Sequence, residues 1–167
     1  SALAARLTED PNCSVLLLEA GKPDNYRWIH IPLGLGKLMQ DPRYMWQYST
    51  EPEPNLKGQQ VYWPRGKVIG GSSSVNGMVY VRGSAYDYDQ WRDSGCPGWG
   101  FEDVLPALKR LESRPEGDPK YRGHDGPITV TDIRHRGALT EGFYHACVES
   151  GIPPAQDYNG AVYEGVS

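Results

Sequence analysis

The order of apolar and polar residues predicts alternating helices and strands joined by long irregular connections. Helix-forming residues occupy 2–7, and the aliphatic run Val15–Leu18, with turn-forming residues on both sides, is typical of a buried strand in a parallel sheet. A helix, a short turn and a strand that ends in Glu19 make up the second half of a βαβ unit. Its first half, a strand with a Gly-rich turn, would precede residue 1. We therefore expect the chain to be a fragment of a longer protein.

Three further helical patterns follow. Ser84 is a candidate N-cap for a helix over the next nine residues. Residues 101–113 place Val104, Leu105, Leu108 and Leu111 on one stripe, and we expect Pro106 in the first turn of that helix. The third pattern covers 138–150 and is closed by Gly151. A short helical run is expected near 33–39, and short strands at 46–50, 61–63 and 128–131. Together these elements predict an α/β fold, in part α+β.

Composition and charge exclude several classes of protein. The chain has 21 acidic and 17 basic side chains and no Lys/Arg tract, so we expect no nucleic-acid partner. No stretch reaches the roughly 18 apolar residues of a transmembrane segment. The three cysteines lie far apart and the histidines show no metal-binding spacing, so neither a metal site nor a disulfide framework is expected. The four histidines are interpreted as loop or surface residues: His30, His124, His135 and His145.

Glu19 is the first candidate binding residue. An acid at the end of the second strand of a dinucleotide-binding fold accepts hydrogen bonds from the ribose hydroxyls of adenosine and disfavours a 2′-phosphate. Gly21 permits a tight turn or the close approach of a ligand. The alternative is that Glu19 is a solvated acid at a strand end, and the pattern alone leaves both interpretations open.

The segment 65–83 is the second candidate site and is rich in glycine and serine. Gly70 and Gly71 can adopt positive φ or allow a ligand to approach the main chain. The serines that follow can cap a short helix whose N–H groups face an anion, and Asn76 and Gly77 can contact a planar polar ring. A flexible linker is the alternative, but the apolar residues on both sides argue against it. The spacing predicts a cofactor site lined by main chain, for any ligand that carries phosphate.

The run from Gly66 to Asp89 resembles the first signature of the glucose–methanol–choline (GMC) family of FAD-dependent oxidoreductases. The matching positions are Gly66, Lys67, Ile69, Gly70, Gly71, Ser72, Ser73, Val75, Asn76, Tyr80, Gly83 and Asp89. Flanking stretches at 17–21, 62–66, 125–127 and 157–165 also resemble the family, so the likeness spans nearly the whole chain. It points most closely to the branch of choline and alcohol dehydrogenases.

The resemblance implies a fragment of an FAD-binding, Rossmann-like GMC fold and a set of cofactor-binding residues. Glu19 would bind the adenosine ribose, and a further set would line the pyrophosphate and the flavin: Val68, Gly70, Gly71, Ser72, Ser73, Asn76, Gly77, Met78 and Val79. Some relatives link FAD covalently through a histidine at the position of Val75, so FAD is expected to be non-covalent here. The family's catalytic histidine lies outside this sequence, and we nominate no catalytic residue and no metal ligand.

The resemblance also implies a function and a division into domains. Residues 1–100 would belong to the FAD-binding domain, and 101–167 would begin the substrate-binding domain. The activity would be oxidation of an alcohol such as choline with hydride transfer to the flavin, followed by transfer of electrons to oxygen or to a quinone or cytochrome. The isolated fragment is expected to be inactive. Two alternatives remain, a hydroxynitrile lyase that uses FAD structurally and a carbohydrate-binding module. The sequence does not indicate a compartment.

Overall fold

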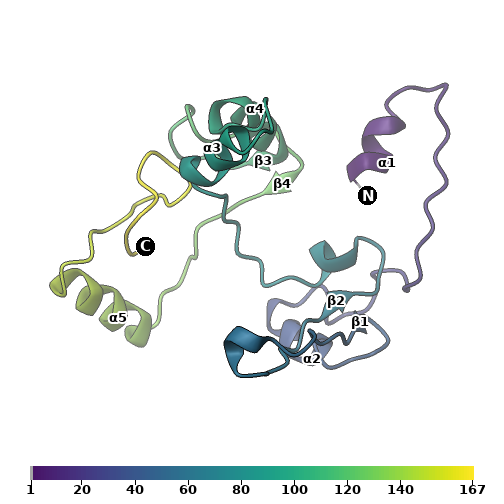
Figure 1. Cartoon of the computed structure of the whole chain (residues 1–167), viewed down its shortest axis with the longest axis horizontal. Helices are drawn as coiled ribbons and strands as arrows, with labels where there is room; N and C mark the ends of the chain where they lie inside the picture. The colour runs from purple at the N-terminus through teal and green to yellow at the C-terminus, as the bar shows by residue number, and fades with distance from the viewer. Residues whose placement is uncertain (1) are drawn as a thin grey trace. The chain divides into compact units, whose positions relative to one another are not determined.

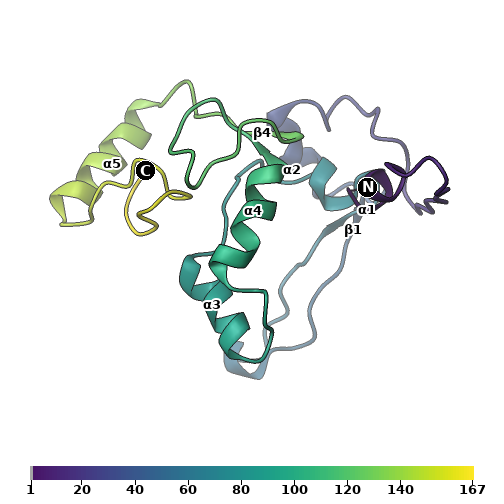
Figure 2. The same cartoon turned by 90° about the horizontal axis from the view of Figure 1, so that it is seen from above.

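The chain divides into two compact units, one ending at Val79 and the other spanning Tyr80–Ser167. A computed structural model describes residues 2–167. Figures 1 and 2 show the course of the chain in two views. The boundary expected near residue 100 is of another kind. It would separate the residues that serve the cofactor from those that serve the substrate, and it stays a prediction.

The first unit contains short elements connected by long irregular segments. They are the helices α1 (Ala2–Leu7) and α2 (Leu35–Leu38), the 3-10 helices η1 (Pro32–Gly34), η2 (Pro54–Leu56) and η3 (Gly71–Ser74), and the strands β1 (Met45–Trp46) and β2 (Arg65–Gly66). Strands β1 and β2 pair antiparallel, and the pairing continues at Ser49 and Tyr62. The strands predicted at 46–50 and 61–63 are therefore formed in part, and the helical run predicted near 33–39 is confirmed.

A small hydrophobic core holds the first unit together. Its buried members are Leu38, Tyr44, Met45, Val68 and Val75. Tyr26 lies flat against Tyr44, with ring centroids 4.6 Å apart, and closes one side of this core. Figure 1 shows α2, β1 and β2 gathered in this part of the chain. Two of the five core residues, Val68 and Val75, belong to the Gly/Ser-rich segment, so that segment is anchored and is not a linker.

The strand predicted at Val15–Leu18 is absent, and this prediction is wrong. The segment has no regular structure, and Leu16 and Leu18 are more than four-fifths exposed. A strand needs a neighbour for its backbone hydrogen bonds, and none pairs with these four residues within 2–167. The first parallel pairing on this stretch is the bridge between Lys22 and Val68. The long trace that follows α1 in Figure 1 is this unpaired segment.

The second unit contains the longer helices. They are α3 (Ala85–Asp93), α4 (Phe101–Leu111) and α5 (Ala138–Glu149), and the strands β3 (Glu112–Ser113) and β4 (Ile128–Thr129) pair in parallel. Ser84 caps α3 as predicted, because its hydroxyl accepts from the Asp87 N–H while the Asp87 carboxylate accepts from the Ser84 N–H. Gly151, which follows Ser150 at the C-cap of α5, has φ +89°, and this confirms its predicted role. Figure 2 shows the turn that joins α3 to α4.

Pro106 does not lie in the first turn of its helix as predicted. Helix α4 begins at Phe101, where the Asp103 carboxylate accepts from the Gly100 N–H, so Pro106 is the sixth helical residue. It therefore removes the hydrogen bond that would reach the carbonyl of Glu102. The helix also ends earlier than predicted, because Glu112 turns to the extended conformation and starts β3.

Candidate functional site

Residues 66–75 form a tight loop around a helical turn of glycine and serines. Gly70 and Gly71 have φ values of +90° and +61°, so both adopt the left-handed conformation that the sequence predicts. The chain then enters η3, and the Val68 side chain behind it is fully buried. Because the whole residue is buried and its carbonyl accepts from the Gly71 N–H, Val68 supports the loop from behind.

The serines do not cap a following helix, as the sequence suggested, but form η3 themselves. Ser74 Oγ donates to the Ile69 carbonyl at 2.7 Å, Ser73 Oγ donates to the Gly70 carbonyl at 2.5 Å, and Ser72 Oγ accepts from the Gly66 N–H at 3.0 Å. Each serine hydroxyl thus forms a hydrogen bond with the main chain of the same loop. The N-cap position of η3 is Gly70, which has no side chain to cap it.

Asn76 organises the next turn. Its Nδ2 donates to the Ser73 carbonyl at 3.0 Å, and its Oδ1 accepts from the Met78 N–H at 2.7 Å. Met78 adopts φ +60°, which is uncommon for a residue other than glycine. Met78 and Val79 are both mostly exposed. The turn therefore directs an apolar pair outward, which is unfavourable unless something covers it.

The structure brings the turn that follows Glu19, at Gly21 and Lys22, next to this loop. Gly21 packs so tightly on the main chain of Lys67 and Val68 that an added Cβ would lie 2.1 Å from the Lys67 carbonyl carbon. The Ile69 N–H donates to the Lys22 carbonyl at 2.9 Å. One oxygen of the Glu19 carboxylate accepts from the Gly21 N–H at 2.6 Å. The two candidate sites are therefore neighbours, which their separation of about fifty residues did not reveal.

The glycines of this region fall into two kinds. Gly21, Gly66 and Gly70 are needed for packing, since an added Cβ would meet other atoms of the unit at 2.1–2.4 Å. Gly71 and Gly77 are different, because a Cβ there would meet nothing within 4 Å at Gly71 and only the Leu35 Cδ2 atom, at 3.9 Å, at Gly77. Gly77 also lies outside the left-handed region. Neither internal packing nor backbone conformation explains the glycine at 77.

A small pocket lies beside the loop. Its volume is about 140 Å³, and its lining includes Ser73, Asn76, Met78, Trp28 and Leu35. Drug-sized ligands occupy pockets of roughly 300–1,000 Å³, so this one admits only the edge of a larger group. Such a group would rest mainly on the exposed main chain.

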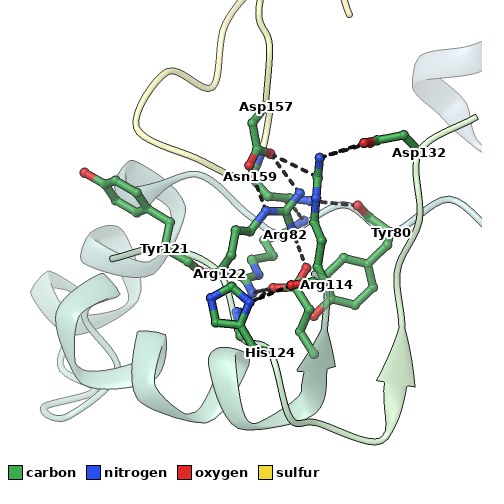
Figure 3. A network of polar contacts seen from close by, with 11 residues as sticks. Tyr80, Arg82, Arg114, Tyr121, Arg122, His124, Asp132, Asp157 and Asn159 are labelled. Atoms are coloured by element: carbon green, nitrogen blue, oxygen red, sulfur yellow. Dashed lines mark hydrogen bonds and ion pairs between the residues drawn. The ribbon is translucent and has the colours of Figure 1, made fainter. Parts of the chain in front are cut away.

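The second unit contains a buried polar network that the sequence analysis missed. The Glu112 carboxylate, which is fully buried, accepts from Arg82 Nη2 and Arg122 Nη1 at 2.5 Å and from the Gly123 N–H at 3.1 Å. Arg122 also donates to both oxygens of Asp157, each at 2.8 Å. Figure 3 shows Asp157 and Asn159 reaching this cluster from the C-terminal loop. The bonded residues lie 10 to 77 positions apart in the sequence, so no pattern of neighbouring residues predicts the network.

The positive and negative charges in this network balance, and the surrounding groups keep the Asp157 carboxyl ionised. Partial burial works to raise the pKa of the Asp157 carboxyl. Hydrogen bonds from the Arg122 guanidinium and the Asn159 N–H, with the nearby charges of Arg122 and Arg114, outweigh burial and hold the pKa below its ordinary value. Asp157 is therefore ionised at neutral pH, and two carboxylates face two buried guanidinium groups.

All four histidines are exposed; His30 Nε2 lies 2.5 Å from the Asp24 carbonyl and His124 Nδ1 lies 2.7 Å from the Arg114 carbonyl. Within 2–167, no three metal-ligating side chains gather at one point. Across the same residues, the helices are too short or too polar to cross a bilayer.

The fold of each unit and the glycine-lined loop agree with one class of protein. The chain belongs to the GMC oxidoreductase family, whose N-terminal model matches residues 9–167. This is a family of FAD-dependent flavoproteins, and the resemblance noted in the sequence is confirmed.

Particular relatives are choline dehydrogenases. The chain is 47% identical over 169 residues to an oxygen-dependent choline dehydrogenase of Rhizobium etli and 46% identical to one of Brucella anthropi. Among solved structures, it resembles pyridoxine 4-oxidase from Mesorbium loti, with a TM-score of 0.88 and 34% identity over 98% of the chain. It also resembles a formate oxidase, with a TM-score of 0.80 and 28% identity over 96% of the chain. The matches to the choline dehydrogenases include 99% of this chain but only about 30% of the length of each relative. The chain likewise spans 32% of the pyridoxine 4-oxidase and 30% of the formate oxidase.

Proposed function

We propose that this chain forms part of the FAD site of an oxidoreductase that acts on the CH–OH group of a choline-type alcohol. The observation that carries the proposal is the main chain at Gly71 and Gly77, which is open although the loop around it is tightly packed. A flat ring can lie directly on such a surface, whereas a Cβ would hold it away.

The residues present fit FAD. Gly70, Gly71, Ser72 and Ser73 would face the pyrophosphate and flavin region with main-chain groups, and the buried Val68 would support them from behind. Asn76, Gly77, Met78 and Val79 would lie along the edge of the isoalloxazine, where the exposed apolar pair would be covered. Glu19 is exposed and uses one carboxylate oxygen within its own turn. The other oxygen has no partner among residues 2–167 and would accept from the adenosine ribose hydroxyls.

The cofactor would be held without a covalent bond at Val75. That side chain is buried in the hydrophobic core and has no nucleophilic atom. When bound, FAD supplies the capacity to accept a hydride from the alcohol carbon. The part of this chain would be to orient the cofactor and to place N–H donors near its ring, where each bond to a charged acceptor is worth about 1.5–3 kcal/mol.

The names of the curated relatives support choline as substrate and oxygen as electron acceptor. The test uses the complete polypeptide that carries these residues. We expect it to purify with bound flavin and to lose the absorption of oxidised flavin when choline is added without oxygen. Tetramethylammonium, which has the same cationic head but no hydroxyl, is the control. Admission of air should restore the oxidised spectrum.

Other results would overturn this function. Bound flavin that choline and other alcohols leave oxidised, with cleavage of a cyanohydrin, would favour the lyase. A protein without flavin that retains oligosaccharides in equilibrium dialysis would favour the carbohydrate-binding module.

A further inference from the structure

The side chain of Asn159 takes the place of a neighbouring strand for residues 80–82. Asn159 Nδ2 donates to the Tyr80 carbonyl at 2.8 Å, and Asn159 Oδ1 accepts from the Arg82 N–H at 2.8 Å. A C=O and an N–H two residues apart point to the same side of an extended chain and are the groups that a β partner would engage. One amide therefore fixes two successive peptide planes, on either side of Val81 (Figure 3).

A closed ring of hydrogen bonds holds Asn159 in this orientation. The Asn159 N–H donates to Asp157, Asp157 accepts from Arg122, and Arg122 and Arg82 both donate to Glu112. The Arg82 N–H then returns to Asn159. The formal charges of the four ionised residues cancel. Because Asn159 is only 5% exposed, its amide cannot turn to water without leaving buried groups unpaired.

We propose that Asn159 is a positioning residue, which fixes the main chain directly after Met78 and Val79 so that these residues present their backbone correctly to the flavin. This role rests on the proposed function, since it concerns the segment assigned to the isoalloxazine edge. Residues 80–82 have no regular secondary structure, so the Asn159 amide supplies their ordering where a sheet would otherwise do so, directly after the turn that Asn76 organises. Asn159 acts through the main chain and does not itself touch the substrate.

The test compares Asn159→Ala with Asn55→Ala, an exposed asparagine, in the polypeptide that carries the chain. Amide hydrogen exchange and the FAD dissociation constant are measured on the same samples. For N159A we expect exchange at 77–82 to rise at least tenfold, exchange in α3 and α4 to stay within twofold, and the FAD dissociation constant to rise about tenfold, as for the loss of two neutral hydrogen bonds. N55A should match the unsubstituted protein in both readouts.

Asn159→Ser covers the case in which N159A fails to fold. Serine is neutral, so it leaves the charge balance of the network unchanged, and its short hydroxyl can reach at most one of the two main-chain groups, so we expect faster exchange at 77–82 and a smaller loss of FAD affinity than in N159A. Unchanged exchange at 77–82 would overturn the inference. So would faster exchange with unchanged FAD affinity, since the role would then be structural only. Failure of the proposed function is distinguished from both, because it appears in the unsubstituted protein as absence of flavin.

Discussion

The two units hold their functional segments in opposite ways. In the first unit, the loop 66–75 is fixed by Val68 and Val75 in a small apolar core and by glycines that let backbones touch. In the second, the buried hydrophobic residues are only Leu105 and Ala155, whereas Arg82, Glu112, Arg122 and Asn159 are buried and polar. An apolar core tolerates small losses, but a buried charge network fails when one member is removed. The units should therefore respond differently to mutation.

The largest effect is expected at Glu112. Glu112→Ala leaves the buried guanidinium groups of Arg82 and Arg122 without their shared carboxylate, which costs about 3–5 kcal/mol of the free energy of unfolding. Urea unfolding followed by circular dichroism measures it. Glu116→Ala, at an exposed position four residues on, is the control and should change the midpoint little. Equal, small effects at both positions would mean that the network is not formed in solution.

The next effect is expected at Gly66 in the first unit. Gly66→Ala would place its Cβ 2.4 Å from the carbonyl carbon of Gly71, so the loop must shift, at a cost of about 1–3 kcal/mol in stability. Gly142→Ala is the matched control, since it lies inside α5 with no atom within 4 Å of the added Cβ. That change should stabilise the protein by up to about 1 kcal/mol. A stable G66A protein would contradict the tight packing of the loop.

Acid should weaken the second unit through Asp157. Its pKa is lowered in the folded state, so its contribution to stability is complete well above the ordinary value of 3.8 and is lost as the pH falls through the lower folded value. Asp157→Asn should be less stable at neutral pH and should show a shallower loss of stability below that value. Unfolding midpoints measured across this range check it. Asp125→Asn, at an exposed carboxylate, should keep the slope of the unsubstituted protein.

The contrast also explains what the sequence could predict. Local chemistry identified the positive φ of Gly70 and Gly71, the cap at Ser84 and the end of α5 at Gly151, because each depends on a few consecutive residues. The strand at Val15–Leu18 failed, because a strand depends on a partner. Pro106 was misplaced, because the helix does begin at Phe101, as its predicted range implied, and this makes Pro106 its sixth residue. The sequence did not predict the network of Arg82, Glu112 and Arg122. Charged residues are usually exposed to solvent, and these three are buried together only because the fold joins distant segments.

Gly77 offers the most direct test of the central claim, that open main chain receives the flavin. Gly77→Ala introduces no clash and no strained φ, so the free energy of unfolding should change by less than about 1 kcal/mol. In the polypeptide that carries these residues, we predict that G77A raises the FAD dissociation constant about tenfold or more, equivalent to about 1.4 kcal/mol, whereas G142A leaves it unchanged. FAD affinity that is equal in G77A and the unsubstituted protein would contradict the account.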